Sequence, residues 1–231
     1  MNVNSNGYTY TFATIMVVVV AVILSIAAMS WSGRQKANIR QEKKQNILAS
    51  VGVDVDRSEA EVAFDQYIVQ SLTVQNGQVV NEDPTAAFNI DMAAVVKEGV
   101  DERAVPLYVA EKDGETFYIL PLRGNGLWGP IWGYVALESD GNTVVGANFD
   151  HKGETPGLGA EIIAPFFTEQ FAGKKLVDAE GNYKSIAVMK KGTGSGDHVV
   201  DGISGGTITS DGVSAMLKNC LEPYANYFKN K

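Results

Sequence analysis

Residues 106–122 read PLYVAEKDGETFYILPL, and this stretch contains the clearest indication of the fold. Two runs rich in Val, Tyr, Ile and Phe flank Asp113-Gly114, a dipeptide that favours the tight turn of a β-hairpin. The arrangement recurs in WGYVALESDGNTVVGANF (132–149), which turns at Asp140-Gly141, and in LTVQNGQVV (72–80), which turns at Asn76-Gly77. Half-buried strands favour such β-branched and aromatic residues. The pattern therefore predicts consecutive hairpins and an antiparallel sheet.

Helical patterns flank the predicted strands. The clearest is C-terminal, because apolar residues recur there at i, i+3, i+4, i+7, i+8, i+11 and i+15, namely Val213, Met216, Leu217, Cys220, Leu221, Tyr224 and Phe228. We expect Asp211 or Ser210 to cap the start of this helix and Pro223 to bend it.

Two shorter helices and one more strand complete the prediction. Residues 58–67 predict a helix in which Ser58 is the N-cap and Glu61 completes a capping box. Residues 162–171 predict a second helix, 185–189 a strand, and the glycine-rich residues 190–196 a flexible loop. The expected fold class is α+β, with one antiparallel sheet flanked by helices.

The N-terminal region predicts a membrane anchor. No Asp, Glu, Lys or Arg occurs between Met1 and Gly33, and residues 12–29 are almost wholly apolar. At about 1.5 Å per residue, Tyr10 to Trp31 would span roughly 30 Å of hydrocarbon, with aromatic side chains at both interfaces. A cleaved signal peptide is the alternative, but the stretch lacks a basic n-region and its apolar run is long.

The expected domain organisation follows from this anchor. It comprises an N-terminal tail (1–9), a transmembrane helix (10–31), a polar stalk helix with its linker (32–57) and one domain (58–231). The stalk helix is predicted over 34–49, with Gly52 as its stop. Five basic residues follow the span, and the positive-inside rule would place the domain in the cytoplasm: Arg34, Lys36, Arg40, Lys43 and Lys44.

Composition excludes several kinds of function. The formal net charge is −8, which disfavours a nucleic-acid binder, since that class needs concentrated Lys and Arg. Cys220 is the only cysteine, so this chain alone can form neither an internal disulfide nor an all-cysteine iron–sulfur site. Four acidic residues, Asp54, Asp56, Glu82 and Asp83, lack the spacing of an EF-hand, and we interpret them as surface charge rather than a metal site.

The chemistry is carried by residues 201–210, DGISGGTITS, a glycine-rich turn that leads into a helix. Gly205 and Gly206 allow close approach of a ligand, and successive backbone N–H groups at the helix start favour an anion. Ser204, Thr207 and Thr209 add hydroxyl groups. From composition alone, a tight turn before a capped helix is the favoured explanation of the segment, because such turns are common.

The residues themselves resemble a known motif. Asp201-x-x-Ser204-Gly205-Gly206-Thr207 is similar to Asp-x-x-(Ser/Thr)-Gly-Ala-Thr, the flavinylation motif of FMN-binding domains in respiratory complexes. In that family a flavin transferase joins the phosphate of FMN to the final threonine as a phosphoester. The resemblance implies one covalent FMN per chain, on Thr207. Gly206 departs from the usual alanine, and both residues are small.

Two further segments resemble the same family, in the same order along the chain. Residues 151–159, HKGETPGLG, are similar to a loop that lies near the flavin, and residues 124–129, GNGLWG, to a Gly-x-Gly-Leu-Trp segment. The expected cofactor-binding residues are therefore Thr207, Ser204, Gly205, Gly206, Thr209, Asp201, His151, Glu154, Thr155, Pro156, Gly157, Leu158, Gly159 and Trp128. Thr155, Gly157 and Leu158 are expected to approach the isoalloxazine ring, and no catalytic residue is predicted.

Several of these residues have a simpler interpretation. His151 could be a loop histidine that bonds to the backbone, and Glu154 a solvated carboxylate. Trp128 and Trp132 could be core aromatics, which is the interpretation we favour for Trp132. Cys220 lies on the apolar helix stripe, so we expect a buried, inert thiol.

Over nearly its whole length the chain resembles the C subunits of sodium-translocating NADH:quinone oxidoreductases, and secondly the G subunits of the related ferredoxin:NAD electron-transport complexes. The resemblance implies an electron-relay subunit in the bacterial inner membrane, with the FMN domain on the periplasmic side, against the local charge count. Its expected partners are the other subunits, a flavin transferase and membrane lipid. A non-redox membrane-anchored binding module is the alternative, whereas a sensory module is disfavoured because no signalling domain is fused to it.

Overall fold

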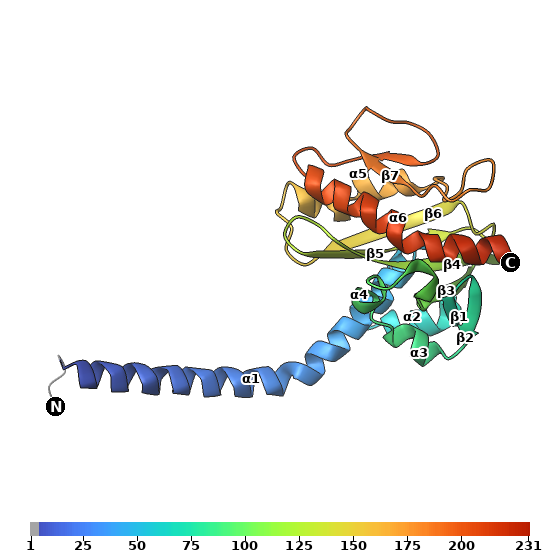
Figure 1. The fold of residues 1–231 in the computed structure, drawn as a ribbon. Helices are drawn as coiled ribbons and strands as arrows, with labels where there is room; N and C mark the ends of the chain where they lie inside the picture. The colour runs from blue at the N-terminus through green and yellow to red at the C-terminus, as the bar shows by residue number, and fades with distance from the viewer. Residues whose placement is uncertain (1–4) are drawn as a thin grey trace. The chain divides into compact units, whose positions relative to one another are not determined.

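The computed structural model describes residues 5–231, so the predicted N-terminal tail lies partly outside the described residues (Figure 1). The helices are α1 (Asn6–Ala49), α2 (Ala60–Tyr67), α3 (Pro84–Asn89), α4 (Met92–Val95), α5 (Pro165–Thr168) and α6 (Thr207–Asn230), with short 3-10 helices η1 (Val100–Glu102), η2 (Gly159–Ile163) and η3 (Glu169–Phe171). The strands are β1 (Ile68–Gln75), β2 (Gln78–Asn81), β3 (Val105–Lys112), β4 (Glu115–Asn125), β5 (Pro130–Leu137), β6 (Val144–His151), β7 (Ala187–Met189) and β8 (Val199–Asp201).

The chain divides into two compact units, Met1–Lys43 and Lys44–Lys231. The first unit is formed by helix α1, which contains an 18-residue window of mean hydropathy 2.8 with none of its residues buried in the structure. By length and composition this helix can cross a membrane. The same helix continues through residues 34–49, where the sequence predicts a separate stalk helix, and its last turn belongs to the second unit.

The second unit is built on a six-stranded sheet in the order β2-β1-β3-β4-β5-β6. All neighbouring strands in this sheet are antiparallel, which confirms the predicted hairpins. Asn76 and Gly77, with φ of 49° and 68°, form the first tight turn, and Asp113 and Gly114, with 55° and 83°, the second. Strands β7 and β8 form a separate parallel pair.

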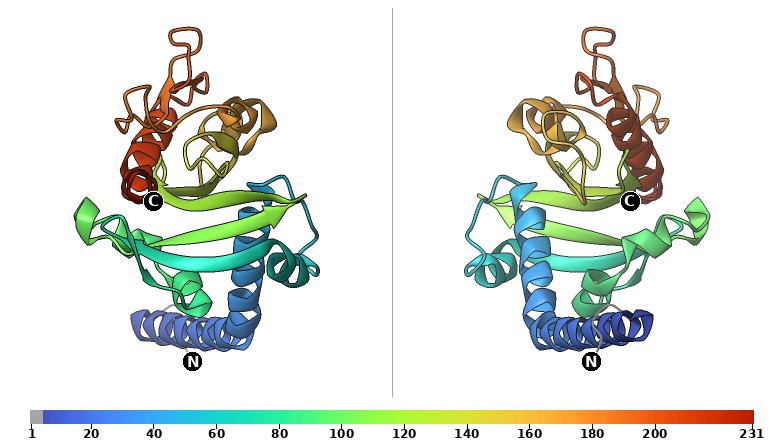
Figure 2. Two further views of the ribbon diagram at one scale, coloured as in Figure 1. Left: turned by 90° about the vertical axis from the view of Figure 1, so that its right-hand side faces the viewer. Right: turned by 90° about the vertical axis from the view of Figure 1, so that its left-hand side faces the viewer.

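Both faces of the large sheet are covered (Figure 2). On one face Leu107 and Leu120 pack in a core cluster with side chains of α6 and of the η2–η3 region. On the other face Tyr108 and Ile119 pack in a second cluster with the end of α1, α2 and Phe88 of α3. Six consecutive residues of β3 and six of β4 are therefore buried, whereas the sequence pattern suggests half-buried strands. An antiparallel sheet loses its polar face when helices cover both sides.

Helix α6 begins before the first residue of the predicted apolar stripe. Its N-cap is Gly206, so the prediction that Asp211 or Ser210 caps the helix is wrong. Ser210 lies inside the first turns, where its hydroxyl oxygen accepts a hydrogen bond from the N–H of Ile203 at 3.0 Å. The helix continues through Pro223, and the predicted stripe is buried except for the half-buried Phe228.

Two other predicted helices are altered. Helix α2 starts at Ala60, its N-cap is Glu59, and no side chain caps it, so the capping box at Ser58 and Glu61 is wrong. The carboxylate of Glu61 instead lies 2.7 Å from Nζ of Lys44. The helix predicted over 162–171 is divided into the end of η2, α5 and η3, because Pro165 lacks the N–H that a continuous helix requires.

Within the second unit, Lys44 holds the last turn of α1 to α2. The residue is only 3% exposed, yet its ammonium group pairs with Glu61 and lies 4.6 Å from the ring centroid of Phe64. Two residues of the same turn, Ile47 and Leu48, are fully buried. The aliphatic stem of a lysine packs well in such a place while its charged end reaches an acid near the surface.

Replacing Lys44 with alanine should lower the free energy of unfolding by about 2 kcal/mol, through loss of a charged hydrogen bond and of stem packing. Urea denaturation of the full chain in detergent, followed by tryptophan fluorescence, would measure this change. Lys36→Ala removes an exposed charge and should change stability by less than about 0.5 kcal/mol. Equal stability of the Lys44→Ala protein and wild type would contradict the role of Lys44.

Candidate functional site

Sheet register brings two of the three sequence motifs to one end of the sheet, and the packing of α6 brings the third. Asn125 at the end of β4 pairs with Pro130 at the start of β5, and Ile131 of β5 pairs with His151 at the end of β6. The turn at 124–129 and the loop that follows His151 therefore lie at the same end of the strands. Helix α6, which starts at the end of the third motif, packs against β4.

Glu154 joins the three motifs through hydrogen bonds. Its Oε1 accepts from the N–H of Trp128 at 2.8 Å, and its Oε2 accepts from the hydroxyl of Thr209 at 2.7 Å. The side chain is buried, with 5% of its surface exposed, so the interpretation as a solvated carboxylate is wrong. A buried carboxylate is stable only when its oxygens are hydrogen-bonded, and both oxygens of Glu154 are.

Two glycines leave room for this carboxylate. A Cβ at Gly126 would lie 2.5 Å from Oε1 of Glu154, and a Cβ at Gly159 would lie 2.5 Å from Oε2 and against the hydroxyl of Thr209. Neither glycine has a positive φ, so close packing rather than backbone conformation explains them.

A first hollow, of about 370 Å³, lies between the three motifs. Its lining residues are Leu127, Trp128, Glu154, Thr155, Leu158, Gly159, Gly205, Gly206, Thr207, Ile208 and Thr209. Much of the rim is apolar and exposed: Trp128 is 66% exposed, Ile208 58% and Leu127 49%. Trp128 is thus not a core residue, and this hollow offers a flat aromatic or apolar ligand a surface to cover.

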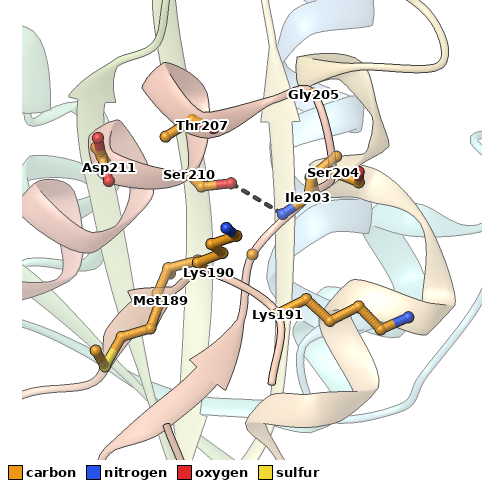
Figure 3. Close-up of a pocket in the computed structure, with 11 residues that line it drawn as sticks. Met189, Lys190, Lys191, Ile203, Ser204, Gly205, Thr207, Ser210 and Asp211 are labelled. Atoms are coloured by element: carbon orange, nitrogen blue, oxygen red, sulfur yellow. Dashed lines mark hydrogen bonds between the residues drawn. The ribbon is translucent and has the colours of Figure 1, made fainter. Parts of the chain in front are cut away.

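A second hollow, of about 240 Å³, lies beside the same turn (Figure 3). It is lined by Val188, Met189, Lys190, Lys191, Gly202, Ile203, Ser204, Gly205, Thr207, Ser210 and Asp211. Gly205 and Thr207 line both hollows. Thr207 therefore stands between an apolar space and a space that two lysines border.

The start of α6 is suited to an anion. No side chain caps it and its first turn contains no acidic residue, so its positive end is not neutralised locally. Gly205 has a φ of 75°, and a Cβ there would lie 2.7 Å from Cδ2 of Leu158. The turn at 201–207 can therefore approach the loop at 151–159 this closely only with glycine at position 205.

The three candidate hydroxyl groups differ in exposure. Thr207 and Ser204 are exposed, whereas Thr209 is 1% exposed and its hydroxyl donates to Glu154. Thr209 is thus part of the packing beneath the hollow.

Four predicted site residues line neither hollow: Asp201, His151, Pro156 and Gly157. Asp201 accepts a hydrogen bond from the N–H of Gly192 at 2.8 Å and so holds the loop that carries Lys190 and Lys191. Nδ1 of His151 accepts a hydrogen bond from the backbone N–H of Glu154 at 3.2 Å. This agrees with the simpler interpretation of His151 as a loop histidine that bonds to the backbone. The N–H of Gly157 donates to Oε1 of Glu161 at 2.9 Å.

Ten residues that line the two hollows are absent from the predicted set: Leu127, Ile208, Val188, Met189, Lys190, Lys191, Gly202, Ile203, Ser210 and Asp211. The two lysines fall in the predicted flexible loop, although they directly follow a predicted strand. Parallel pairing of β7 with β8, which leads into the motif turn, brings them to the site. Adjacent lysines after a strand are too common to indicate a site without that pairing.

The structure agrees with some of the remaining sequence interpretations and not with others. Cys220 is 2% exposed, which confirms the predicted burial, and burial raises the pKa of its thiol to about 11. Trp132 is half-buried beside Arg123 rather than a core residue. All four acidic residues interpreted as surface charge, Asp54, Asp56, Glu82 and Asp83, are exposed. Within residues 5–231 there is no cluster of three or more metal-ligating side chains.

Comparison with known proteins gives consistent matches. The FMN-binding domain family matches residues 126–222, which include the loop at 151–159 and the turn at 201–210. The chain is 34% identical over 216 residues to the C subunit of the Na(+)-translocating NADH-quinone reductase of Vibrio campbellii, covering 84% of this chain and 82% of that protein.

Two solved structures are similar as well. The crystal structure of the C subunit of the Na(+)-translocating NADH-quinone reductase from Parabacteroides distasonis has a TM-score of 0.78 and 45% identity, covering 85% of this chain and 96% of that one. Shewanella oneidensis NqrC has a TM-score of 0.67 and 27% identity, covering 83% and 98%.

Gly159→Ala should disrupt the site from within, because its Cβ would collide with Glu154 and Thr209. We expect a loss of about 1–3 kcal/mol in unfolding free energy, the usual cost of overpacking, measured by urea denaturation. Gly153→Ala is the matched control, since a Cβ there has nothing within 4 Å and its φ is not positive. Equal stability of the two variants would show that the packing around Glu154 is loose.

Proposed function

Because this chain belongs to the C-subunit family of Na(+)-translocating NADH-quinone reductases, we propose that it carries FMN, joined through phosphate to Thr207, as an electron-relay subunit of such a complex. The observation that carries the proposal is the position of Thr207, exposed at the start of α6 between the two hollows.

The residues around Thr207 fit the parts of FMN. The first hollow would hold the isoalloxazine ring, with the indole of Trp128 and the side chain of Leu158 as its apolar walls. The uncapped end of α6 supplies backbone N–H groups for the phosphate. Lys190 and Lys191 add positive charge beside it.

Thr207 suits the attachment better than its neighbours. Thr209 is buried and its hydroxyl is bonded to Glu154, so a transferase cannot reach it without opening the site. Ser204 is exposed and is the remaining competitor, but of the three candidate hydroxyl residues, all within the described part of the chain, Thr207 alone lines both hollows. The Thr207 oxygen would form the new bond to phosphorus and lose its proton, while the bond to the leaving phosphate of an FMN phosphoanhydride breaks.

The chain's own task is to hold and shield the cofactor. FMN, when bound, can accept and release electrons, and the protein need only position it and tune its surroundings. Trp128, Leu158 and Ile208 would shield the ring, and the open rim would leave it accessible to other subunits. Reduction of quinone by NADH and its coupling to sodium transport belong to the whole complex in this proposal.

The anchor would hold the relay at the inner membrane, with α1 as a single span. We place the FMN domain on the periplasmic side, following the family resemblance rather than the basic residues after the span. Partner proteins in the complex can constrain insertion, and a local charge excess is only one orientation signal. A flavin transferase on the same side would complete maturation.

Thr207→Ala should abolish covalent flavin, since a phosphoester needs a hydroxyl oxygen, and Thr207→Ser should retain some attachment. After co-expression with a flavin transferase, in-gel fluorescence would score attachment. Mass spectrometry would search for the FMN adduct on the tryptic peptide 192–218. Because Thr207 is exposed, the Ala variant should remain folded.

Ser204→Ala is the matched control, because it removes the other exposed hydroxyl and should leave the adduct in place. An adduct that survives Thr207→Ala, or that maps to Ser204 or Thr209, would overturn the assignment.

Orientation can be tested with a cysteine in place of Lys191, an exposed position in the 190–196 loop. A membrane-impermeant maleimide should label Lys191→Cys in intact cells if the domain is periplasmic. Cys220 should give little background, because burial raises its pKa to about 11 and maleimides react with the thiolate. Labelling only after cell lysis would place the domain in the cytoplasm.

A further inference from the structure

We propose that Glu154 is the positioning residue of the flavin site: its carboxylate fixes the ring's apolar walls relative to Thr207 and lowers the flavin's reduction potential. The proposal rests on the function proposed above, and it assigns to Glu154 a role that acts partly through Trp128 and Thr209.

The first argument is connectivity. The two oxygens of Glu154 reach different parts of the chain, the N–H of Trp128 at 2.8 Å and the hydroxyl of Thr209 at 2.7 Å. Trp128 belongs to the turn between β4 and β5, and Thr209 lies in the first turn of α6, two residues after Thr207. Glu154 itself lies in the loop after β6, so one side chain joins three segments that adjoin only in the folded protein.

The second argument is that the carboxylate has little freedom to move. Its backbone N–H donates to Nδ1 of His151 at 3.2 Å, which holds the start of the loop to the end of β6. Gly126 and Gly159 lie so close that either Cβ would be 2.5 Å from a carboxylate oxygen. Because the carboxylate is confined in this way, it fixes the positions of the three segments relative to one another.

The third argument concerns the walls of the first hollow. The loop that carries Glu154 also carries Leu158, whose N–H donates to the carbonyl of Thr155 at 3.1 Å. Trp128, hydrogen-bonded to Glu154 through its backbone, is the other wall. The distance between these two walls, and from each to Thr207, is therefore governed by the bonds of Glu154.

The fourth argument is electrostatic. Among the described residues that line the first hollow, Glu154 alone has a charged side chain. Both its oxygens act as acceptors, which is the hydrogen-bonding pattern of a carboxylate. Reduction places additional electron density on a flavin, and the nearby negative charge of a buried carboxylate opposes this. Glu154 should therefore lower the reduction potential of a ring bound in this hollow.

Two substitutions separate the charge from the hydrogen bonds. Glu154→Gln keeps the size of the side chain and removes its charge, whereas Thr209→Val removes one hydrogen-bond donor at nearly constant shape. Thr209→Ser restores the donor and is the conservative rescue. Glu138→Gln is the charge control, because Glu138 is exposed at the other end of the β5–β6 hairpin.

The experiment uses the full flavinated chain in detergent, after mass spectrometry has confirmed the adduct on Thr207 in each variant. Spectroelectrochemical titration should show a positive shift of the flavin midpoint potential in Glu154→Gln and none in Glu138→Gln. Thr209→Val should lower the fluorescence anisotropy of the flavin, because the walls are then held less firmly, and Thr209→Ser should restore it.

A second measurement needs no flavin. In the Thr207→Ala background, Glu154→Ala should increase hydrogen exchange over residues 126–130 and 155–160, read by mass spectrometry, while the remaining strands stay protected. Unchanged exchange would overturn the positioning role whatever the state of the cofactor.

The outcomes distinguish this inference from the proposed function. A wild-type chain without flavin on Thr207 would overturn the proposed attachment and, with it, the role of Glu154 toward the ring. The role of Glu154 alone would be overturned by a chain that is flavinated on Thr207 but shows two unchanged quantities. These are the flavin midpoint potential in Glu154→Gln and the flavin fluorescence anisotropy in Thr209→Val.

Discussion

The pairing of β4 with β5 and of β5 with β6 is the constraint on which the site depends. Antiparallel register places Asn125 beside Pro130 and Ile131 beside His151, so two loops lie at the same end of the strands. A slip of one residue would turn the buried side chains of β5 to the opposite face, and both core clusters would lose their contacts. Burial on both faces therefore determines the register, and the register determines where the motifs meet.

Close packing of α6 on the end of β4 brings the third motif to the same place. A Cβ on Gly124 would lie 2.7 Å from Cβ of Met216, and a Cβ on Gly212 would collide with the carbonyl of Asn125. These glycines let the helix lie directly on the strand, so that Thr209 reaches Glu154. The hydrogen bond between these two side chains then depends on packing several residues away along each element.

The net charge of the protein is negative, whereas the surroundings of Thr207 are positive. An acidic chain, with a formal net charge of −8, has at Thr207 an uncapped helix start and two lysines on a neighbouring loop. The carboxylate of Glu154 lies on the other side, in the apolar hollow. A bound FMN would thus meet positive charge near its phosphate and one negative charge near its ring, an asymmetry suited to retaining the cofactor while tuning its electrons.

The sequence by itself determined the hairpins, the long apolar helix, the C-terminal helix and the motif turn, because each depends on local periodicity or on turn residues such as Asn76-Gly77 and Asp113-Gly114. It misplaced the helix caps at Ser58 and Ser210, since Glu61 pairs with Lys44 and Ser210 bonds to Ile203, both contacts of the folded chain. Only the tertiary structure decided that Glu154 is buried, that Thr209 donates to it and that Lys190 and Lys191 border the site. These features join segments far apart in the sequence, and a hydrogen bond or a shared hollow between such segments leaves no periodic signal in either one.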